Sequence, residues 1–324
     1  EWVRGFVHRA TPRLPLRWGI AALLALTAAF TIRDYFLVWP NHAEVQRVYR
    51  ADLAAVAAYL NDHTPPGGVA ISTSEPNHLD RFIFDYTPHG AVTAIHWFDG
   101  LNALVAPAGE SPAWLFVTGE PEIGARLRER YLDRLPLVEE RRFESGALAY
   151  ALVEVPPGDA FLARFPPPTD QGVWVAEVLA FPPDDPAGIR TPLAYPVQFG
   201  DALQLVGYES PPRNPANNWL PITLVFRVTR DVDQPEPWAL FAHLLEASGA
   251  LVAGRDFLAV PASTWRAGDA FVQLHDVALG DLAPGLYHLE IGLYSQADGA
   301  RFPVLVNGVP VGDRLLLEPV EVTP

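Results

Sequence analysis

The order of apolar and polar residues divides the chain into three parts, of which the first is an apolar run near the N-terminus. From Trp18 to Ile32 no charged residue occurs, and after Arg33-Asp34 the apolar character resumes and continues to Trp39. As a helix, this stretch would be roughly 33 Å long at about 1.5 Å per residue, which matches a hydrocarbon core of roughly 30 Å. The sequence therefore predicts a transmembrane helix over residues 18–39.

The flanks of the run support the same interpretation. Aromatic residues of the types that collect at membrane interfaces stand at both ends, and arginines precede it. By the positive-inside rule, residues 1–17 form a basic cytoplasmic flank and residues 41–324 lie outside the cytoplasm, at the cell membrane. A signal-peptide core and a buried helix also fit an apolar run. Contacts with the membrane interface are expected from Arg17, Trp18, Tyr35 and Trp39.

Between residues 41 and 155, helical and strand patterns alternate. Apolar residues recur at three- and four-residue spacing from Asn41 to Asn61, which predicts an amphipathic helix. Further helices are expected at 79–86 and 120–132. Strands are expected at 69–73, 92–96, 104–105, 114–117, 137–143 and 147–155. This alternation predicts an exported α/β sandwich domain over residues 41–155.

The pattern changes after a proline-rich segment. Residues 156–170 are expected to be a linker that is too rich in proline for regular structure. Beyond them, strands are expected at 203–208, 222–228, 238–245, 251–258, 271–279, 286–294 and 315–322. Turn residues separate these strands, so residues 171–324 are predicted to form an antiparallel β-sandwich of jelly-roll or immunoglobulin-like type.

Composition narrows the classes of function. All 23 basic residues are arginine, and the chain has no cysteine, which excludes disulfides, thiolate metal sites and cysteine nucleophiles. It also has no methionine, so we expect it to be the C-terminal part of a longer protein. Residues 1–40 carry five arginines and two acids, whereas the remainder carries 18 arginines and 36 acids. The acidic remainder disfavours nucleic acid and anionic headgroups as partners. Arginine in place of lysine, with 33 prolines, fits a thermophile or a GC-rich genome.

A polar cluster after the expected strand at 69–73 is a candidate ligand site. Ligands bind at the carboxyl ends of strands in open α/β sheets. Ordinary helix capping by Ser74 or Asn77 is the competing interpretation. The candidate ligand-edge residues are Ser72, Ser74, Asn77 and His78.

Tryptophans of the second domain suggest a sugar site, because an aromatic face can stack on a pyranose ring. The candidates are Trp219, Trp265 and Asp269, and core packing is the competing interpretation. His243 and His275 fall inside expected strands, where a structural role is favoured. Calcium binding at Asp231 and Asp233, or at Asp184 and Asp185, is disfavoured, because two acids in a loop are common. No phosphate-binding loop, nucleophile elbow or zinc-protease motif occurs, and no cofactor, metal or catalytic residue is expected.

One part of the chain resembles a known family. The elements are Arg-Asp-Tyr-Phe-x-x-Trp-Pro (Arg33–Pro40), Tyr49-Arg50-Ala51-Asp52-Leu53 and Ala57-Ala58-Tyr59-Leu60, after an apolar helix. They are similar to the last transmembrane helix and following exported segment of bacterial GT-C glycosyltransferases of the protein-mannosyltransferase and aminoarabinose-transferase type. The second domain resembles C-terminal domains appended to such proteins in filamentous anoxygenic phototrophs, through Trp265-x-x-Gly268-Asp269, Pro284-Gly285-x-Tyr287 and Gly292-Leu293-Tyr294.

The resemblance implies a region without catalytic residues of its own, since those of the family lie upstream of such a segment. It implies an acceptor-side or scaffolding role in an enzyme that uses a polyprenyl-phosphate sugar donor. The partners would be the lipid bilayer, the upstream transmembrane region or other membrane subunits, and a glycan or lipid-linked sugar. Two alternatives stay open: a single-span accessory or surface structural subunit, and a carbohydrate-binding module.

Overall fold

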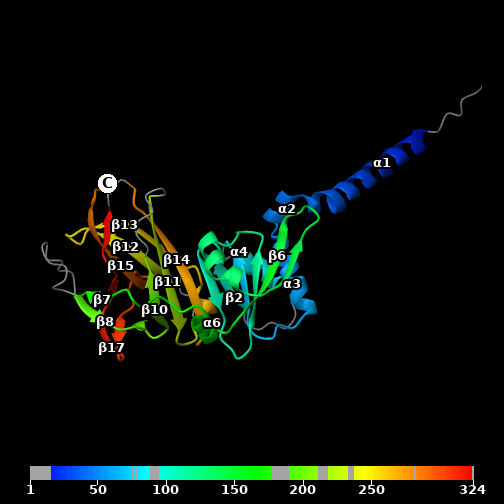
Figure 1. Ribbon diagram of the computed structural model, residues 1–324. Coiled ribbons are helices and arrows are strands. Elements are labelled where there is room, and N and C mark those ends of the chain that lie inside the picture. The colour runs from blue at the N-terminus through cyan, green and yellow to red at the C-terminus, as the bar shows by residue number, and fades with distance from the viewer. Residues whose placement is uncertain are drawn as a thin grey trace, which may run out of the picture.

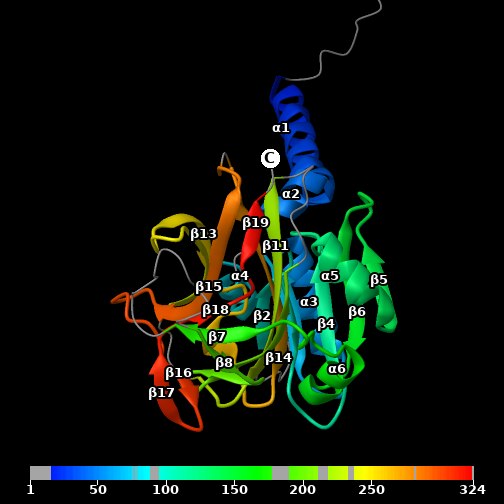
Figure 2. The same cartoon turned by 60° about the vertical axis from the view of Figure 1, so that its left-hand side comes forward.

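The computed structural model describes residues 16–74, 76, 79–87, 95–176, 190–210, 218–232, 237–280 and 282–322. In these residues a long N-terminal helix precedes a β-rich part that is built on three sheets. Figure 1 shows the helix projecting away from the sheets, and Figure 2 shows the same arrangement from a second side.

The N-terminal helix is exposed among the residues that the structure describes. It runs through α1 (Leu16–Arg33), a π-helical turn η1 (Asp34–Val38) and a 3-10 turn η2 (Trp39–Asn41). Residues Arg17–Asn41 are long and apolar enough to cross a membrane, and none of that span is buried. A signal sequence near an N-terminus would have the same character.

The expected helix from Asn41 to Asn61 is in fact two helices. α2 (Ala43–Val48) ends at Tyr49, and α3 (Ala51–Asp62) begins after Arg50, whose backbone is left-handed with φ 50°. The expectation of one continuous helix is therefore wrong. The physical reason is that the left-handed residue redirects the chain and turns the Arg50 side chain into the protein, where it is 6% exposed.

A five-stranded sheet forms the first lobe, in the order β2-β1-β4-β6-β5. Its strands are β1 (Val69–Thr73), β2 (Ile95–Asp99), β4 (Ala113–Thr118), β5 (Leu137–Arg142) and β6 (Leu148–Val155). β2, β1 and β4 are parallel, and β5 and β6 add antiparallel strands. Leu53, Val56 and Leu60 of α3 pack on one face together with Ile71 and Phe116. The shorter helices are α4 (Leu79–Asp85), α5 (Ala125–Arg130) and the 3-10 turn η3 (Leu132–Arg134).

Two seven-stranded sheets form the second lobe. One has the order β17-β16-β9-β10-β11-β14-β3, and the other has the order β13-β12-β15-β18-β7-β8 with β19 paired to β15. The bounds in the first are β17 (Val309–Gly312), β16 (Val304–Val306), β9 (Val197–Phe199), β10 (Leu203–Glu209), β11 (Trp219–Val228), β14 (Ala270–Ala278) and β3 (Ala103–Ala106). Those in the second are β13 (Leu251–Phe257), β12 (Trp238–Leu245), β15 (Gly285–Ser295), β18 (Leu315–Leu316), β7 (Val173–Ala176), β8 (Arg190–Leu193) and β19 (Val320–Val322), and a 3-10 turn, η5 (Ala262–Thr264), follows β13.

The two lobes share a strand and a hydrophobic core. β3 lies in the part of the sequence that builds the first lobe, yet it pairs antiparallel with β14. One cluster of buried residues includes Leu115 and Leu127 from the first lobe and Phe226 and Leu240 from the second. The described parts of the two lobes therefore form one continuous body.

The expected linker contains a helix. α6 (Gly158–Arg164) lies within residues 156–170, and its Phe161 and Leu162 are buried in the shared core. The expectation of no regular structure there is wrong, because the prolines flank the helix. Pro157 is the residue before α6, where a missing N–H removes no intrahelical hydrogen bond. The Gly158 N–H donates to the Pro107 carbonyl over 3.1 Å, which fixes the start of α6 against the strand connection after β3.

Candidate functional site

The strongest polar constellation among the described residues surrounds the guanidinium of Arg50. Its Nε and Nη2 lie 3.0 and 3.1 Å from the two carboxylate oxygens of Asp52, a two-point ion pair. Its Nη1 contacts the Asp80 carboxylate and lies 3.3 Å from Thr73 Oγ1. Nη2 also donates to the Glu120 carbonyl over 3.0 Å. Such charge-assisted bonds are roughly twice as strong as neutral ones.

This Arg50 cluster, defined as Arg50, Asp52, Thr73 and Asp80, ties three elements together. Thr73 is the last residue of β1, Asp80 belongs to α4, and Asp52 belongs to α3. The cluster thus lies at the carboxyl end of a parallel strand, the edge at which open α/β sheets bind ligands. Burial lowers the pKa of Arg50, but the hydrogen bonds and charges of Asp52 and Asp80 outweigh it and raise that pKa overall. The guanidinium therefore stays charged and paired.

The predicted ligand edge is only partly present. Ser72 is fully buried, and its Oγ accepts a 2.9 Å hydrogen bond from the Thr118 N–H, so it joins β1 to β4 and is closed to a ligand. The prediction for Ser72 is therefore wrong, because its side chain is used within the sheet. Ser74 is exposed and stays a prediction. Asn77 and His78 lie outside the described residues.

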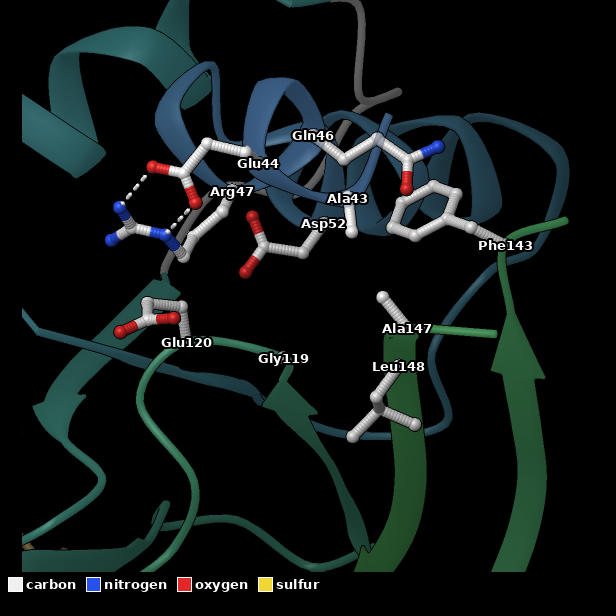
Figure 3. A pocket seen from close by; sticks show the side chains of 10 residues that line it. All are labelled: Ala43, Glu44, Gln46, Arg47, Asp52, Gly119, Glu120, Phe143, Ala147 and Leu148. Carbon is white, nitrogen blue, oxygen red and sulfur yellow. Dashed lines mark hydrogen bonds and ion pairs between the residues drawn. The ribbon is translucent and has the colours of Figure 1, made fainter. Parts of the chain in front are cut away.

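A cavity of about 210 Å³ opens beside the Arg50 cluster, between α2 and the β5–β6 hairpin. Figure 3 shows the Asp52 carboxylate at one side of the cavity, with Phe143 and Leu148 at the other. Ser145 in the hairpin donates to Gln46 Oε1 over 2.6 Å, which holds the hairpin against α2. The cavity is lined by Ala43, Glu44, Gln46, Arg47, Asp52, Gly119, Glu120, Phe143, Ala147 and Leu148.

The size and charge of this cavity limit what it can hold. Pockets for drug-sized ligands measure roughly 300–1,000 Å³, so a cavity of about 210 Å³ admits a smaller group. Its lining carries three carboxylates and one arginine, and Arg47 is already paired with Glu44 over 2.6 Å. The hydrogen bond and charge of Arg47 lower the pKa of Glu44, so this carboxylate is ionised at neutral pH. An uncharged or cationic polar group fits this balance better than an anion.

A second charged network lies on β12, β13 and β15. His243 Nε2 is 2.7 Å from Asp256 Oδ1, and its Nδ1 is 3.2 Å from Glu290 Oε1. Arg314 Nη1 is 3.0 Å from the other oxygen of Glu290, which is 2% exposed. Burial lowers the pKa of His243, but the carboxylates of Glu290 and Asp256 raise it overall. Burial raises the pKa of Glu290, but His243, Arg314 and Arg301 lower it overall.

The predicted sugar site is not assembled. Trp265 is 1% exposed, packs against Trp238 and Phe271, and donates its Nε1–H to the Val260 carbonyl over 3.0 Å. Asp269 is 1% exposed and accepts hydrogen bonds from the backbone N–H of Ala108 and of Arg266, both over 2.7 Å. The prediction of glycan contact is wrong at both positions, because core packing and lobe joining occupy these side chains.

Trp219 is different from these two residues. It is the first residue of β11 and is 46% exposed, so glycan contact there stays a prediction. Trp265 and Asp269, the residues proposed to act with it, face the interior.

Other polar residues singled out in the sequence have structural roles. His275 is fully buried with its Nε2 2.7 Å from Gln273 Nε2, and burial lowers the pKa of His275 to about 3. Asp231 Oδ1 accepts the Ala267 N–H over 2.8 Å. Asp184, Asp185 and Asp233 lie outside the described residues. Within the described residues, no group of three or more metal-ligating side chains of the His, Cys, Asp and Glu types occurs.

The expected interfacial residues are all exposed on the N-terminal helix. Arg17 and Trp18 lie at its start, and Tyr35 and Trp39 near its end. The Tyr35 and Trp39 rings stack with centroids 5.1 Å apart, and Tyr49 meets Trp39 edge-on at 5.4 Å. These rings connect the long helix to the segment that follows α2.

Sequence reasoning missed the Arg50 cluster, although the pattern contains a signal for it. Gln46 and Arg50 fall at i−7 and i−3 from the buried Leu53, which places two polar residues on the apolar stripe of the expected helix. Polar residues at such positions need buried partners. Comparison with protein-family models, with curated proteins and with solved structures found no match.

Proposed function

We propose that this chain is a membrane-anchored, extracytoplasmic module without catalytic residues of its own. In this proposal it is the acceptor-side or scaffolding region of a membrane glycosyltransferase-like protein that uses a polyprenyl-phosphate sugar donor. The second lobe would be an antiparallel β-sandwich of jelly-roll or immunoglobulin-like type that follows an α/β domain.

The observation that carries the proposal is an apolar helix that the described chain does not bury. Residues Arg17–Asn41 form a helix that is long and apolar enough to cross a membrane, and none of that span is buried. A water-exposed helix of this composition would lose the favourable transfer of its side chains out of water, about 1.5–3 kcal/mol for each large apolar one. A bilayer supplies that environment, and the arginines before the helix favour a cytoplasmic N-terminus.

The link between the helix and the first lobe supports a scaffolding role. The Arg50 cluster fixes the turn between α2 and α3 through Asp52, Thr73 and Asp80. A rigid turn transmits the position of the membrane helix to the sheets, as a scaffold requires.

Two observations favour a lipid-linked sugar as the group near this lobe. The resemblance of Arg33–Pro40 and the following helix to GT-C glycosyltransferases provides the class of reaction. The cavity is lined by α2, which follows the membrane helix within a few residues. Its size and its three carboxylates suit the uncharged sugar of such a donor, with the phosphate outside the cavity.

Alkaline carbonate extraction of membranes that contain the chain tests the anchor. We expect the chain to stay in the membrane pellet and to be released by detergent. Release into the carbonate supernatant would contradict the proposal and would indicate a cleaved signal sequence.

Photo-crosslinking tests the proposed ligand class. A benzophenone attached to Ala147→Cys, which lines the cavity, should label a polyprenyl-phosphate sugar in reconstituted liposomes, whereas one on the exposed Ser248→Cys should not. Equal labelling at both positions would contradict the proposal. Crosslinks to another membrane protein would instead favour the accessory-subunit alternative.

A further inference from the structure

Next to the end of the membrane helix lies a second exposed apolar surface, at the C-terminal end of α2. Val48, the last residue of α2, is 58% exposed, and Tyr49, which follows it, is 62% exposed, although Gln46 on another side of α2 is buried. Tyr49 contacts Trp39 edge-on, and Trp39 stacks on Tyr35. We call Tyr35, Trp39, Val48 and Tyr49 the interfacial cluster.

The depth of this cluster follows from the length of the helix. Trp39 comes 21 residues after Trp18, which corresponds to roughly 32 Å at about 1.5 Å per residue. That distance matches the hydrocarbon thickness of roughly 30 Å. With Trp18 at one boundary, Trp39 lies at the other. The centroid of the Tyr49 ring is 5.4 Å from that of Trp39, so the two rings differ in depth by no more than that distance.

We propose that Val48 and Tyr49 form, with Tyr35 and Trp39, a second membrane contact that holds the first lobe against the outer headgroup region. This inference rests on the proposed membrane anchor. Tyrosine and tryptophan suit that region because one end of each side chain is apolar and the other is polar. The surface is continuous with the apolar face of the membrane helix, so a bilayer that covers one reaches the other.

The charge of the surroundings defines the lipid. Arg47 is paired with Glu44, and the remainder of the chain after residue 40 is strongly acidic, so anionic lipid would be repelled. A zwitterionic headgroup layer is therefore the partner. The same contact would bring the cavity beside α2 to headgroup level, since Glu44 and Arg47 line the cavity and Val48 belongs to the same helix.

An environment-sensitive fluorophore at single cysteines tests the contact in the full chain, reconstituted into phosphatidylcholine vesicles. Val48→Cys is compared with Val138→Cys, a matched valine that is 49% exposed. Val138 lies near the start of β5, four residues before the end of that strand, or roughly 13 Å at about 3.3 Å per strand residue. The turn whose Ser145 contacts α2 begins only beyond that end. Leu24→Cys in α1 reports insertion of the helix itself.

We expect a lipid-borne quencher to reduce the fluorescence at position 48 at least about twofold more than at position 138, as for an interfacially buried apolar face. Equal, water-like behaviour at 48 and 138 with quenching at 24 would overturn the second contact and leave the anchor standing. Shielding of position 48 from water without quenching by lipid would also overturn it, since a protein would then cover the surface. Water-like behaviour at 24 would remove the anchor and the contact together.

Discussion

At Arg50 the backbone occupies a left-handed conformation (φ 50°), which costs a residue with a side chain about 1–3 kcal/mol. The contacts of its guanidinium offset that cost. Asp52 and Asp80 are only 5% and 4% exposed. Without the Arg50 guanidinium, these two buried carboxylates would have no cation between them. A buried charge of that kind is tolerated only when it is paired.

Replacement of Arg50 by alanine should therefore destabilise the protein by about 3–5 kcal/mol, the cost of breaking a buried ion pair. Denaturant unfolding of the full chain in detergent, followed by tryptophan fluorescence, measures this. Arg47→Ala is the matched control, because Arg47 is exposed and its ion pair is with the exposed Glu44. Similar midpoints for Arg50→Ala and the unmodified chain would show that the cluster is not a structural clamp.

The His243 network predicts a dependence of stability on pH. The pKa of folded His243 is raised above its ordinary value of 6.5, so the folded state holds this proton more tightly than the unfolded state. That stabilisation is complete below pH 6.5 and is lost as the pH rises through the folded pKa.

The free energy of unfolding of the unmodified chain should thus exceed that of His243→Gln most below pH 6.5, and this difference should shrink at higher pH. The pKa of folded His275 is lowered to about 3, so this residue is neutral in both folded proteins in this pH range and does not change the difference. Unfolding free energies at several pH values measure this, and a difference that grows with rising pH would contradict the assignment.

At the scale of elements, apolar periodicity predicted most of the second lobe. The strands expected at 203–208, 222–228, 238–245, 251–258, 271–279 and 286–294 correspond to β10, β11, β12, β13, β14 and β15. The alternation of apolar and polar residues within each strand is a local pattern, so it can be recognised from the sequence alone. Residues 315–322 were expected to be one strand and instead form β18 and β19, which pair with different parts of β15.

Long-range pairing explains what the sequence did not reveal. Ala103–Ala106 is a short apolar stretch, and nothing in it specifies pairing with β14 rather than with its neighbours. The break at Arg50 and the buried roles of Trp265 and Asp269 likewise depend on partners far along the chain. The candidate cavity has the same origin, since α2 and the β5–β6 hairpin meet only in the folded protein.

The start of α6 provides a test of the contact between the lobes. A Cβ added to Gly158 would lie 2.1 Å from the carbonyl oxygen of Gly268, which is backbone and cannot move aside cheaply. Gly158→Ala should therefore cost about 1–3 kcal/mol, as overpacking does. Gly285→Ala is the control, because its Cβ would find only Tyr287 at 3.9 Å and should change stability by less than about 0.5 kcal/mol. Equal stability of the two variants would mean that α6 does not fix the lobes together.

For the whole molecule, these contacts combine into one body with a single projecting helix. β3 lies in the sheet of the second lobe, Asp269 accepts the Ala108 N–H, and Arg126 pairs with Asp276 across the boundary. In the proposal, the helix and the interfacial cluster hold one end of this body at the membrane. In the proposed topology the whole body lies on one side of the bilayer.

Labelling of single cysteines with a membrane-impermeant maleimide tests this topology most directly, and the native chain contains no cysteine to interfere. Ser248→Cys lies in the exposed turn between β12 and β13, and Ala10→Cys precedes the helix. In intact cells we expect Ser248→Cys to be labelled, and Ala10→Cys to be labelled only after permeabilisation. Labelling of Ser248→Cys only after permeabilisation would place the body in the cytoplasm and contradict the account.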